Sequence, residues 1–272
     1  METLPQDARK VFKELGTCSR TFFYFLNREF GHTTETEERA ADPLAGGIIQ
    51  KGHQCGMLWG AALAVGAEAY RRAEDSNEAI ALAITATRYL IDSFSQKTGT
   101  ANCREITGTD FSSKLQMLRY MFFRTNRCFG LAEKWGPEAV QAAIEGLERS
   151  QEEMPSEAIS CASETVRKMG GSEEEASMAA GFAGGLGLSG NGCGALAAAI
   201  WMKALAWARE NPGKSPFFNP DSKKTLEAFE EVMGPEMRCS DICGRRFETV
   251  AEHTEFLKNG GCARLIEMLA KV

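Results

Sequence analysis

The chain carries the same pattern twice, and this duplication constrains the fold more than any other feature of the sequence. A glycine pair, a single glycine and a Cys-Gly dipeptide occur at the same offsets in two segments, which end at Cys55-Gly56 and at Cys193-Gly194. The shared glycines are Gly46, Gly47 and Gly52 in the first copy and Gly184, Gly185 and Gly190 in the second. A sequence repeated in this way is built from two copies of one structural unit, so we expect two homologous halves.

Four cysteines recur in the same order in each copy. They are Cys18, Cys55, Cys103 and Cys128 in the first copy and Cys161, Cys193, Cys239 and Cys262 in the second. The shift between equivalent cysteines drifts slowly, as small loop insertions and deletions would leave it. The ninth cysteine, Cys243, has Thr107 at its place in the first copy, and we interpret it as an incidental thiol.

The boundary between the copies is predicted near Trp135-Gly136-Pro137. We expect one helical segment to end at this tripeptide and Pro137 to stand in the first turn of a connecting helix, where its missing N–H is tolerated. The predicted domains are therefore residues 1–136 and residues 137–272.

The spacing of apolar residues predicts helices in both halves. Between Ile80 and Phe94 they recur at steps of 4, 7 and 3, and Leu115, Leu118 and Phe122 recur at steps of 3 and 4. Alanine is abundant in residues 193–208, and β-branched alternation is scarce. The sequence therefore predicts an all-α fold, with roughly four or five helices per half packed as a pseudo-twofold body.

Helix-start signals and glycines suggest where the cysteines lie. Thr34-x-x-Glu37 and Ser172-x-x-Glu175 resemble capping boxes. We expect Cys18 and Cys161 inside helices, Cys55 and Cys193 where a glycine-rich loop becomes a helix, Cys103 and Cys239 in loops, and Cys128 and Cys262 at the start of the last helices. Helix N-termini stabilise thiolates, and glycine runs let backbone N–H groups surround an anion.

The repeated cysteines are candidate metal ligands, and the six shared glycines are candidates for cradling a cofactor. Four thiolates are the set used by iron–sulfur clusters and by structural zinc. Glycine-rich neighbourhoods that donate N–H groups favour a cluster, whereas no two of the repeated cysteines have the Cys-x₂₋₄-Cys spacing of zinc knuckles. Reversible disulfide chemistry by a low-pKa Cys55 or Cys193 is the remaining alternative.

Other motifs support no competing function. Gly185-x-Gly187-x-x-Gly190 matches a dinucleotide fingerprint, but a helical pattern precedes it where that fingerprint needs a strand. No acid–base pair or nucleophile–base arrangement supports a bond-making activity, so the sequence does not decide whether the protein is an enzyme.

Charge and hydropathy limit the partners. A net charge of −6 argues against nucleic acid as a partner, and no window has the ~20 apolar residues of a membrane span. The first residues lack the pattern of an export signal. We therefore expect a cytoplasmic protein with a redox partner protein and no membrane partner, while its oligomeric state stays open.

The cysteine–glycine order resembles the C_GCAxxG_C_C family of redox-active proteins. The matching residues are Cys18, Gly46-Gly47, Cys55-Gly56, Cys103-Arg104-Glu105 and Cys128, then Cys161, Gly184-Gly185, Cys193-Gly194-Ala195, Cys239 and Cys262. The resemblance implies a redox protein of anaerobic type, similar to the iron–sulfur region of split-Soret cytochromes. Two departures stand out: Met57 replaces the alanine after Cys-Gly, and Ser240-Asp241 replace Arg-Glu. Either change could alter the site in its half.

Overall fold

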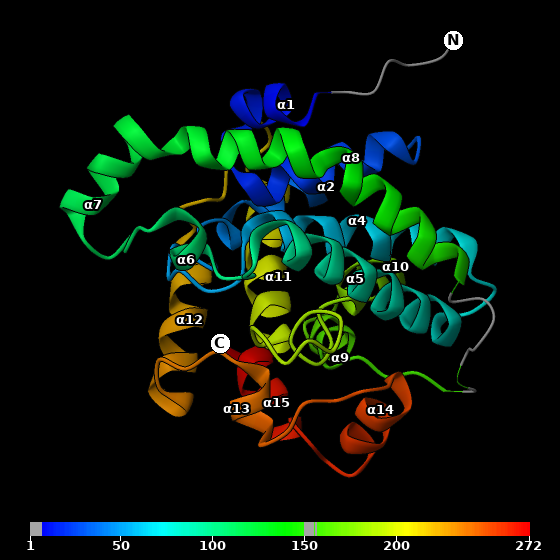
Figure 1. Cartoon of the computed structure of the whole chain (residues 1–272). Helices are drawn as coiled ribbons and strands as arrows, with labels where there is room; N and C mark the ends of the chain where they lie inside the picture. Colours follow the sequence, from blue (N-terminus) through cyan, green and yellow to red (C-terminus); the bar gives the residue numbers. More distant parts are fainter. Residues whose placement is uncertain (1–6, 150–154, 156) are drawn as a thin grey trace.

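The computed structural model describes residues 7–149, 155 and 157–272, and within these residues the chain is helical and contains no β-strand. Figure 1 shows the first half in the upper part of the molecule and the second half below it. The first half contains α1 (Ala8–Leu15), α2 (Cys18–Glu29), α3 (Glu35–Ala40), η1 (Asp42–Leu44), α4 (Gly56–Arg72), α5 (Ser76–Thr98), α6 (Cys103–Thr107), α7 (Lys114–Arg119), the π-helical turn η2 (Tyr120–Arg124) and α8 (Thr125–Arg149). The second half contains α9 (Cys161–Lys168), α10 (Glu173–Ala180), α11 (Gly194–Glu210), α12 (Pro220–Met233), α13 (Cys239–Cys243), α14 (Val250–Lys258) and α15 (Ala263–Lys271).

The helices of the two halves correspond in order, so the all-α prediction and the prediction of two homologous halves are confirmed. Each α-helix from α2 to α8 has a counterpart between α9 and α15, while among the described residues α1, η1 and η2 occur in the first half alone. Each half holds more helices than the four or five expected. Several are single turns, such as α6 and α13, too short to show an apolar period in the sequence.

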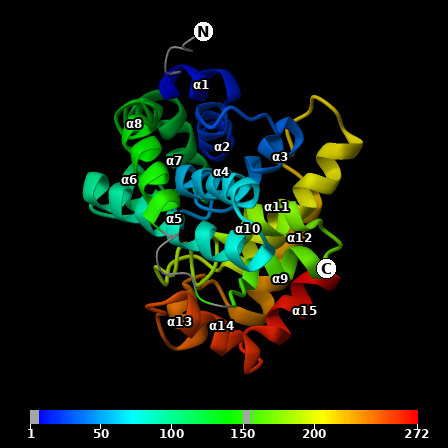
Figure 2. The same ribbon diagram turned by 90° about the vertical axis from the view of Figure 1, so that its right-hand side faces the viewer.

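The two halves pack through reciprocal contacts about a pseudo-twofold axis. Helix α3 of the first half packs on α11 of the second, and its counterpart α10 packs on α4. Two equivalent residues meet between the halves: the Gln54 side chain lies against the backbone of Gly192, where a Cβ would come within 2.1 Å of Gln54 Oε1. A residue that touches its own counterpart defines an isologous contact. Figure 2 shows α4, α10 and α11 together in the middle of the molecule.

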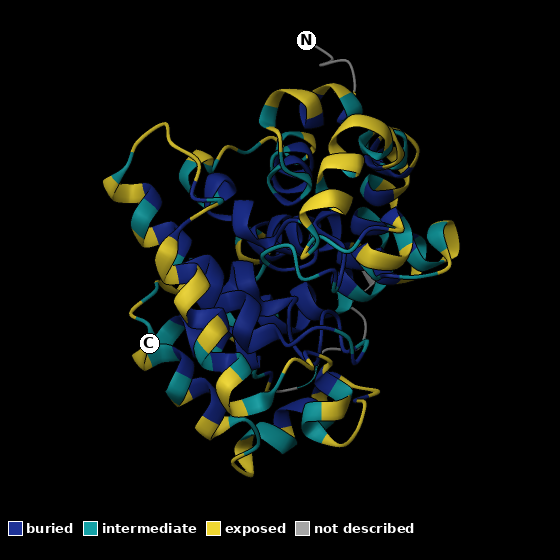
Figure 3. Cartoon of the chain, turned by 90° about the vertical axis from the view of Figure 1, so that its left-hand side faces the viewer, coloured by how far each residue is buried: buried dark blue, intermediate teal, exposed yellow. Residues whose placement is uncertain are grey.

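The core is continuous across both halves. Figure 3 shows the buried residues in the middle of the molecule, with the exposed ones on the outer helices. Trp59 of the first half packs edge-to-face on Phe182 of the second, with ring centroids 4.8 Å apart. A hydrogen bond also joins the halves: Trp201 of the second half donates its indole N–H to the Glu37 carbonyl of the first half, at 3.2 Å. The predicted apolar stripe from Ile80 to Phe94 is buried along α5.

The predicted helix break at Trp135-Gly136-Pro137 is wrong. Helix α8 runs through Pro137 without interruption, and its later part packs on α5, where Gly146 lies against the Ala86 backbone. Trp135 is fully buried between Phe22 and Phe94, so packing on the core holds this helix across the proline.

Only one of the two predicted capping boxes forms. Ser172 and Glu175 cap α10 reciprocally. Helix α3 does follow Thr34, but the Thr34 side chain makes no capping bond and instead accepts a hydrogen bond from Asn27 at 2.7 Å. None of the helices in the described part of the chain is both long and apolar enough to cross a membrane.

Candidate functional site

A left-handed turn precedes the second cysteine of each half. In the first half Gly46, Gly47, Ile48, Ile49 and Gln50 all have positive φ. In the second half Gly184, Gly185, Leu186, Gly187 and Leu188 do the same. Side-chain-bearing residues adopt this conformation at a cost of roughly 1–2 kcal/mol each, and β-branched residues such as Ile48 and Ile49 rarely do. Such strain, present in both halves, makes the turn a candidate functional position.

The glycines of the turn allow close backbone packing. A Cβ on Gly47 would lie 2.4 Å from the His53 nitrogen, and one on Gly185 would lie 2.6 Å from the Asn191 nitrogen. Most N–H groups of each turn donate to backbone carbonyls just before it, as Ile48 N–H does to Leu44, and the turn's own carbonyls accept from later residues, as Gly46 does from Gly52. The sequence predicted that these N–H groups surround an anion. The structure instead leaves the first N–H of each turn for a sulfur: Gly46 donates to Cys18 and Gly184 to Cys161.

The turn also fixes the third cysteine of each half. The Cys103 N–H donates to the His53 carbonyl at 2.6 Å, and the Cys239 N–H donates to the Asn191 carbonyl at 2.5 Å. Each pair forms part of a short antiparallel bridge, so a segment about fifty residues later in the chain is held beside the turn. Because Cys55 directly follows His53-Gln54, the same bridge sets the second and third thiols side by side.

Most of the repeated cysteines lie at helix starts, including four that were predicted elsewhere. Cys55, Cys193 and Cys262 immediately precede helices, as expected. Cys18 and Cys161 were expected inside helices, and Cys103 and Cys239 in loops, but all four are first residues of helices. Cys128 is the exception, since it lies within α8, which continues η2. The single-turn helices α6 and α13 follow from the bridge contact and have no periodic signature in the sequence.

The four first-half thiols lie close enough to influence one another. A hydrogen bond from Cys55 is the main cause of a lowered pKa at Cys18, aided by the backbone N–H of Gly46 and opposed by burial. The same hydrogen bond, together with burial and the neighbouring thiols, raises the pKa of Cys55 well above its usual range. Burial raises the pKa of Cys103 and brings that of Cys128 to about 11.

A pocket of about 670 Å³ opens over the first-half thiols, and all four cysteines line it. Tyr120 also lines it and donates its hydroxyl to Cys128 Sγ at 3.1 Å. The predicted helical stripe of Leu115, Leu118 and Phe122 forms in α7 and η2, yet these side chains are exposed to solvent. The lining is mostly apolar, so a group held by the thiols would have a largely apolar surrounding.

The second half gathers five thiols rather than four. Cys243, which the sequence analysis treated as incidental, lies with its Sγ 3.8 Å from that of Cys239 and 3.7 Å from that of Cys262. Cys161 and Cys193 are near enough to this group to affect its charges. Cys193 receives the N–H groups of Ala195 and Leu196 at the start of α11, but burial still raises its pKa to about 12. The only sequence signal for Cys243 is its spacing of four residues from Cys239.

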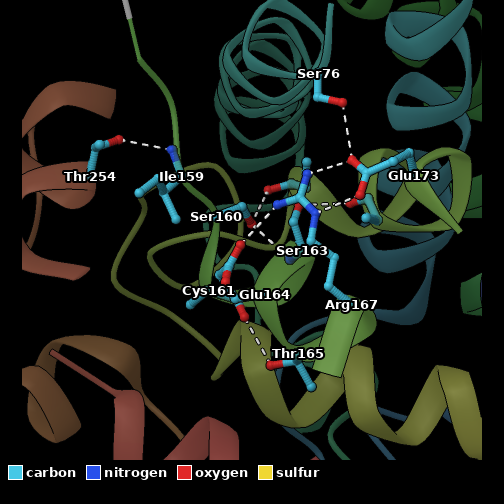
Figure 4. A network of polar contacts seen from close by, with 12 residues as sticks. Ser76, Ile159, Ser160, Cys161, Ser163, Glu164, Thr165, Arg167, Glu173 and Thr254 are labelled. Atoms are coloured by element: carbon cyan, nitrogen blue, oxygen red, sulfur yellow. Dashed lines mark hydrogen bonds and ion pairs between the residues drawn. The ribbon is translucent and has the colours of Figure 1, made fainter. Parts of the chain in front are cut away.

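The start of α9 is held by a network of hydroxyl groups around Cys161 (Figure 4). Ser160 caps the helix and donates to the Ala180 carbonyl at 3.0 Å, and Thr165 donates to the Cys161 carbonyl at 2.8 Å. The preceding Ile159 N–H donates to Thr254 of α14 at 3.0 Å. These bonds fix the backbone that carries Cys161.

The family departure at Ser240 is compensated in the structure. In the first half Arg104 packs on Gly52 and donates to the carbonyl of Lys51. Ser240 packs on Gly190 at the equivalent place, and Arg246 reaches the same turn by donating to the Leu188 carbonyl at 3.3 Å. An arginine therefore covers both left-handed turns.

The sulfurs gather separately in each half. The cysteines that shift the pKa values of Cys18 and Cys55 belong to the first half, and those that shift the pKa values of Cys161 and Cys193 belong to the second. In the described ranges 7–149, 155 and 157–272, no three His, Cys, Asp or Glu side chains are arranged to hold a single metal ion.

The fold and the thiol sets define a duplicated all-α protein that clusters cysteines at helix starts, once in each half. The chain belongs to the C_GCAxxG_C_C family: the model described as "Putative redox-active protein (C_GCAxxG_C_C)" matches residues 17–136 and again residues 156–272. No curated protein and no solved structure matches the chain.

Proposed function

We propose that the protein transfers electrons through iron–sulfur clusters, one held in each half by its four repeated cysteines. The single observation that supports this most is that the fold assembles the same four thiols twice. Four cysteine thiolates are the usual ligand set of such clusters. The proposed ligands are Cys18, Cys55, Cys103 and Cys128 for one cluster and Cys161, Cys193, Cys239 and Cys262 for the other.

The residues present fit such a group. All donors are thiols, and backbone N–H groups already point at sulfur, from Gly46 to Cys18 and from Gly184 to Cys161. The four ligands of an iron–sulfur cluster are divided among two or four irons, so the thiolates need not converge on one point as they do around a single zinc ion. When bound, the cluster would supply one-electron chemistry. The chain would orient the ligands, exclude water from buried thiols and donate hydrogen bonds to sulfur.

The first-half pocket supports access by a partner. Its lining includes the four thiols, Tyr120 and the exposed Phe218, so a redox partner protein could approach the first cluster closely. Apolar surroundings and hydrogen bonds to sulfur are the protein's means of tuning the potential.

Metal and acid-labile sulfide analysis of protein purified without oxygen tests the proposal. We expect iron and sulfide in equal amounts and a visible absorption band. Cys55→Ser and Cys193→Ser should each remove about half of the iron, whereas Cys243→Ser, the matched change at the cysteine outside the family pattern, should remove none. Absence of iron and sulfide after reconstitution would overturn the proposal, and stoichiometric zinc in their place would point to a structural metal.

One observation favours a second candidate, a cofactor-free thiol–disulfide oxidoreductase. The neighbouring Cys55 lowers the pKa of Cys18, and a thiol of lowered pKa beside a second thiol is the arrangement of an attacking and a resolving cysteine. This candidate predicts rapid alkylation of Cys18 in iron-free protein near neutral pH. Alkylation at the rate of an ordinary thiol would count against it.

A further inference from the structure

The two halves differ at one position of the thiol sets. In the first half Thr107 follows Cys103 by four residues, is buried, and donates its hydroxyl to the Cys103 carbonyl at 2.7 Å. In the second half the equivalent residue is Cys243, which brings an extra sulfur into contact with Cys239 and Cys262. The duplication thus provides its own comparison for what a fifth thiol does.

Of the two neighbours of Cys243, Cys262 is the better disulfide partner. Cys239 and Cys243 are four residues apart on the single turn α13, where Cβ atoms are about 5–6 Å apart, whereas a disulfide needs about 3.8 Å. Cys239 is also buried, and its N–H is bonded to Asn191. Forming that bond would require α13 to unwind.

The Cys243–Cys262 pair has no such constraint. The two sulfurs are 3.7 Å apart on separate segments, and both residues are half-exposed. Gly244, directly after Cys243, has open space around it, whereas Gly261, directly before Cys262, packs on the Phe256 ring. The sulfurs need to approach by about 1.7 Å to reach the length of a disulfide bond, and the open space at Gly244 lets the Cys243 side make this shift.

We propose that Cys243 and Cys262 form a reversible disulfide with small disulfides as the oxidant, and that this bond withdraws Cys262 from the second thiol set. The Cys243 thiolate attacks one sulfur of a small disulfide, forms a mixed disulfide and releases one thiolate. The Cys262 thiolate then attacks Cys243 Sγ, closes the internal bond and releases the second thiolate. Two protein thiols lose two electrons and two protons, and the small disulfide becomes two thiols.

This inference rests on the proposed function only for its consequence, that oxidation disables the second cluster site and spares the first. The disulfide itself requires only the thiols. The second half then becomes sensitive to the thiol–disulfide balance of its surroundings, while the first half, with Thr107, does not.

The test treats reduced, iron-free full-length protein with glutathione disulfide, traps the remaining thiols with N-ethylmaleimide and maps the peptides without reduction. We expect two of the nine thiols to disappear and a peptide pair joined through Cys243 and Cys262. Cys243→Thr, which gives the second half the residue of the first, should lose thiols at least tenfold more slowly. Equal loss in this variant, or a bond that joins any other pair, would overturn the inference.

A second arm separates this inference from the proposed function. In protein that carries iron and sulfide, ligation of Cys262 should slow the same disulfide at least tenfold relative to iron-free protein. If no iron binds but the Cys243–Cys262 disulfide forms, the cluster proposal fails and the disulfide stands. If iron binds but all nine thiols of the iron-free protein survive the oxidant, the disulfide inference is overturned and the cluster proposal stands.

Discussion

Replacing Gly185 by alanine should damage the second thiol set by a direct steric effect. Gly185 has a φ of +82°, and a Cβ there would lie 2.6 Å from the Asn191 nitrogen and 2.7 Å from Cys239 Cβ. Gly170, at the end of α9, has nearly the same φ of +81° but has nothing within 4 Å of the equivalent Cβ position. The pair therefore separates the cost of the backbone conformation from the cost of the clash.

The magnitude follows from these two terms. Alanine in the left-handed region costs about 1–2 kcal/mol at either position, and overpacking adds about 1–3 kcal/mol at Gly185 alone. Gly185→Ala should thus lower the free energy of unfolding by about 2–5 kcal/mol and Gly170→Ala by about 1–2 kcal/mol. Because the clash pushes Cys239 from its place, only Gly185→Ala should also change the alkylation rate of Cys239.

Urea unfolding followed by circular dichroism, with reductant and without oxygen, measures both variants against the wild-type chain. Equal destabilisation by the two changes, or an unaltered Cys239 alkylation rate in Gly185→Ala, would refute the argument that close packing of the left-handed turn on the bridge positions this thiol.

Three further changes test other parts of the structure. Burial lowers the pKa of His253 to about 4, so the unfolded chain takes up a proton at this residue before the folded chain does as pH falls from about 6.5 to 4. The free energy of unfolding of the wild type should therefore drop by up to about 3 kcal/mol more than that of His253→Gln in urea unfolding across this range. Parallel pH profiles of the two proteins would contradict a lowered pKa of His253. Tyr120→Phe removes the hydroxyl that donates to Cys128, so a redox titration of cluster-loaded protein should show a lower potential for the first-half cluster and an unchanged potential for the second-half cluster. Two unchanged potentials would contradict a role of this hydrogen bond in setting the potential. A Cβ on Gly66 would lie 2.3 Å from a backbone oxygen of α10, so Gly66→Ala should lower the free energy of unfolding by about 1–3 kcal/mol because it separates the halves. Gly130 has open space around it on α8, so Gly130→Ala should be neutral or stabilising by up to about 1 kcal/mol. Similar melting temperatures of the two variants in thermal unfolding would count against close packing of α10 on α4.

The fold class and the set of repeated cysteines could be predicted because both are encoded along the chain. Equivalent residues of the two copies stand in the same order, and helices leave an apolar period, as α5 does from Ile80 to Phe94. Helix boundaries were less predictable. Pro137 predicted a break, but the packing of α8 against α5 keeps the helix continuous.

The arrangement of the site was decided by the tertiary structure. The glycine spacing indicated a special loop, but not that Ile48 and Ile49 would join its left-handed turn or that most of its N–H groups would donate to backbone carbonyls. Conformations of this kind are unfavourable locally and exist only where surrounding contacts hold them, so local propensity predicts against them.

Cys243 shows most clearly where the sequence stops being informative. By itself the sequence determined the duplication, the all-α class and the eight repeated cysteines, because these depend on residue order and local period. Only the tertiary structure decided that Cys243 lies between Cys239 and Cys262. The position of Cys262 beside Cys243 depends on how α13 and the segment before α15 pack, and a distance between residues so far apart in the chain is set by that packing.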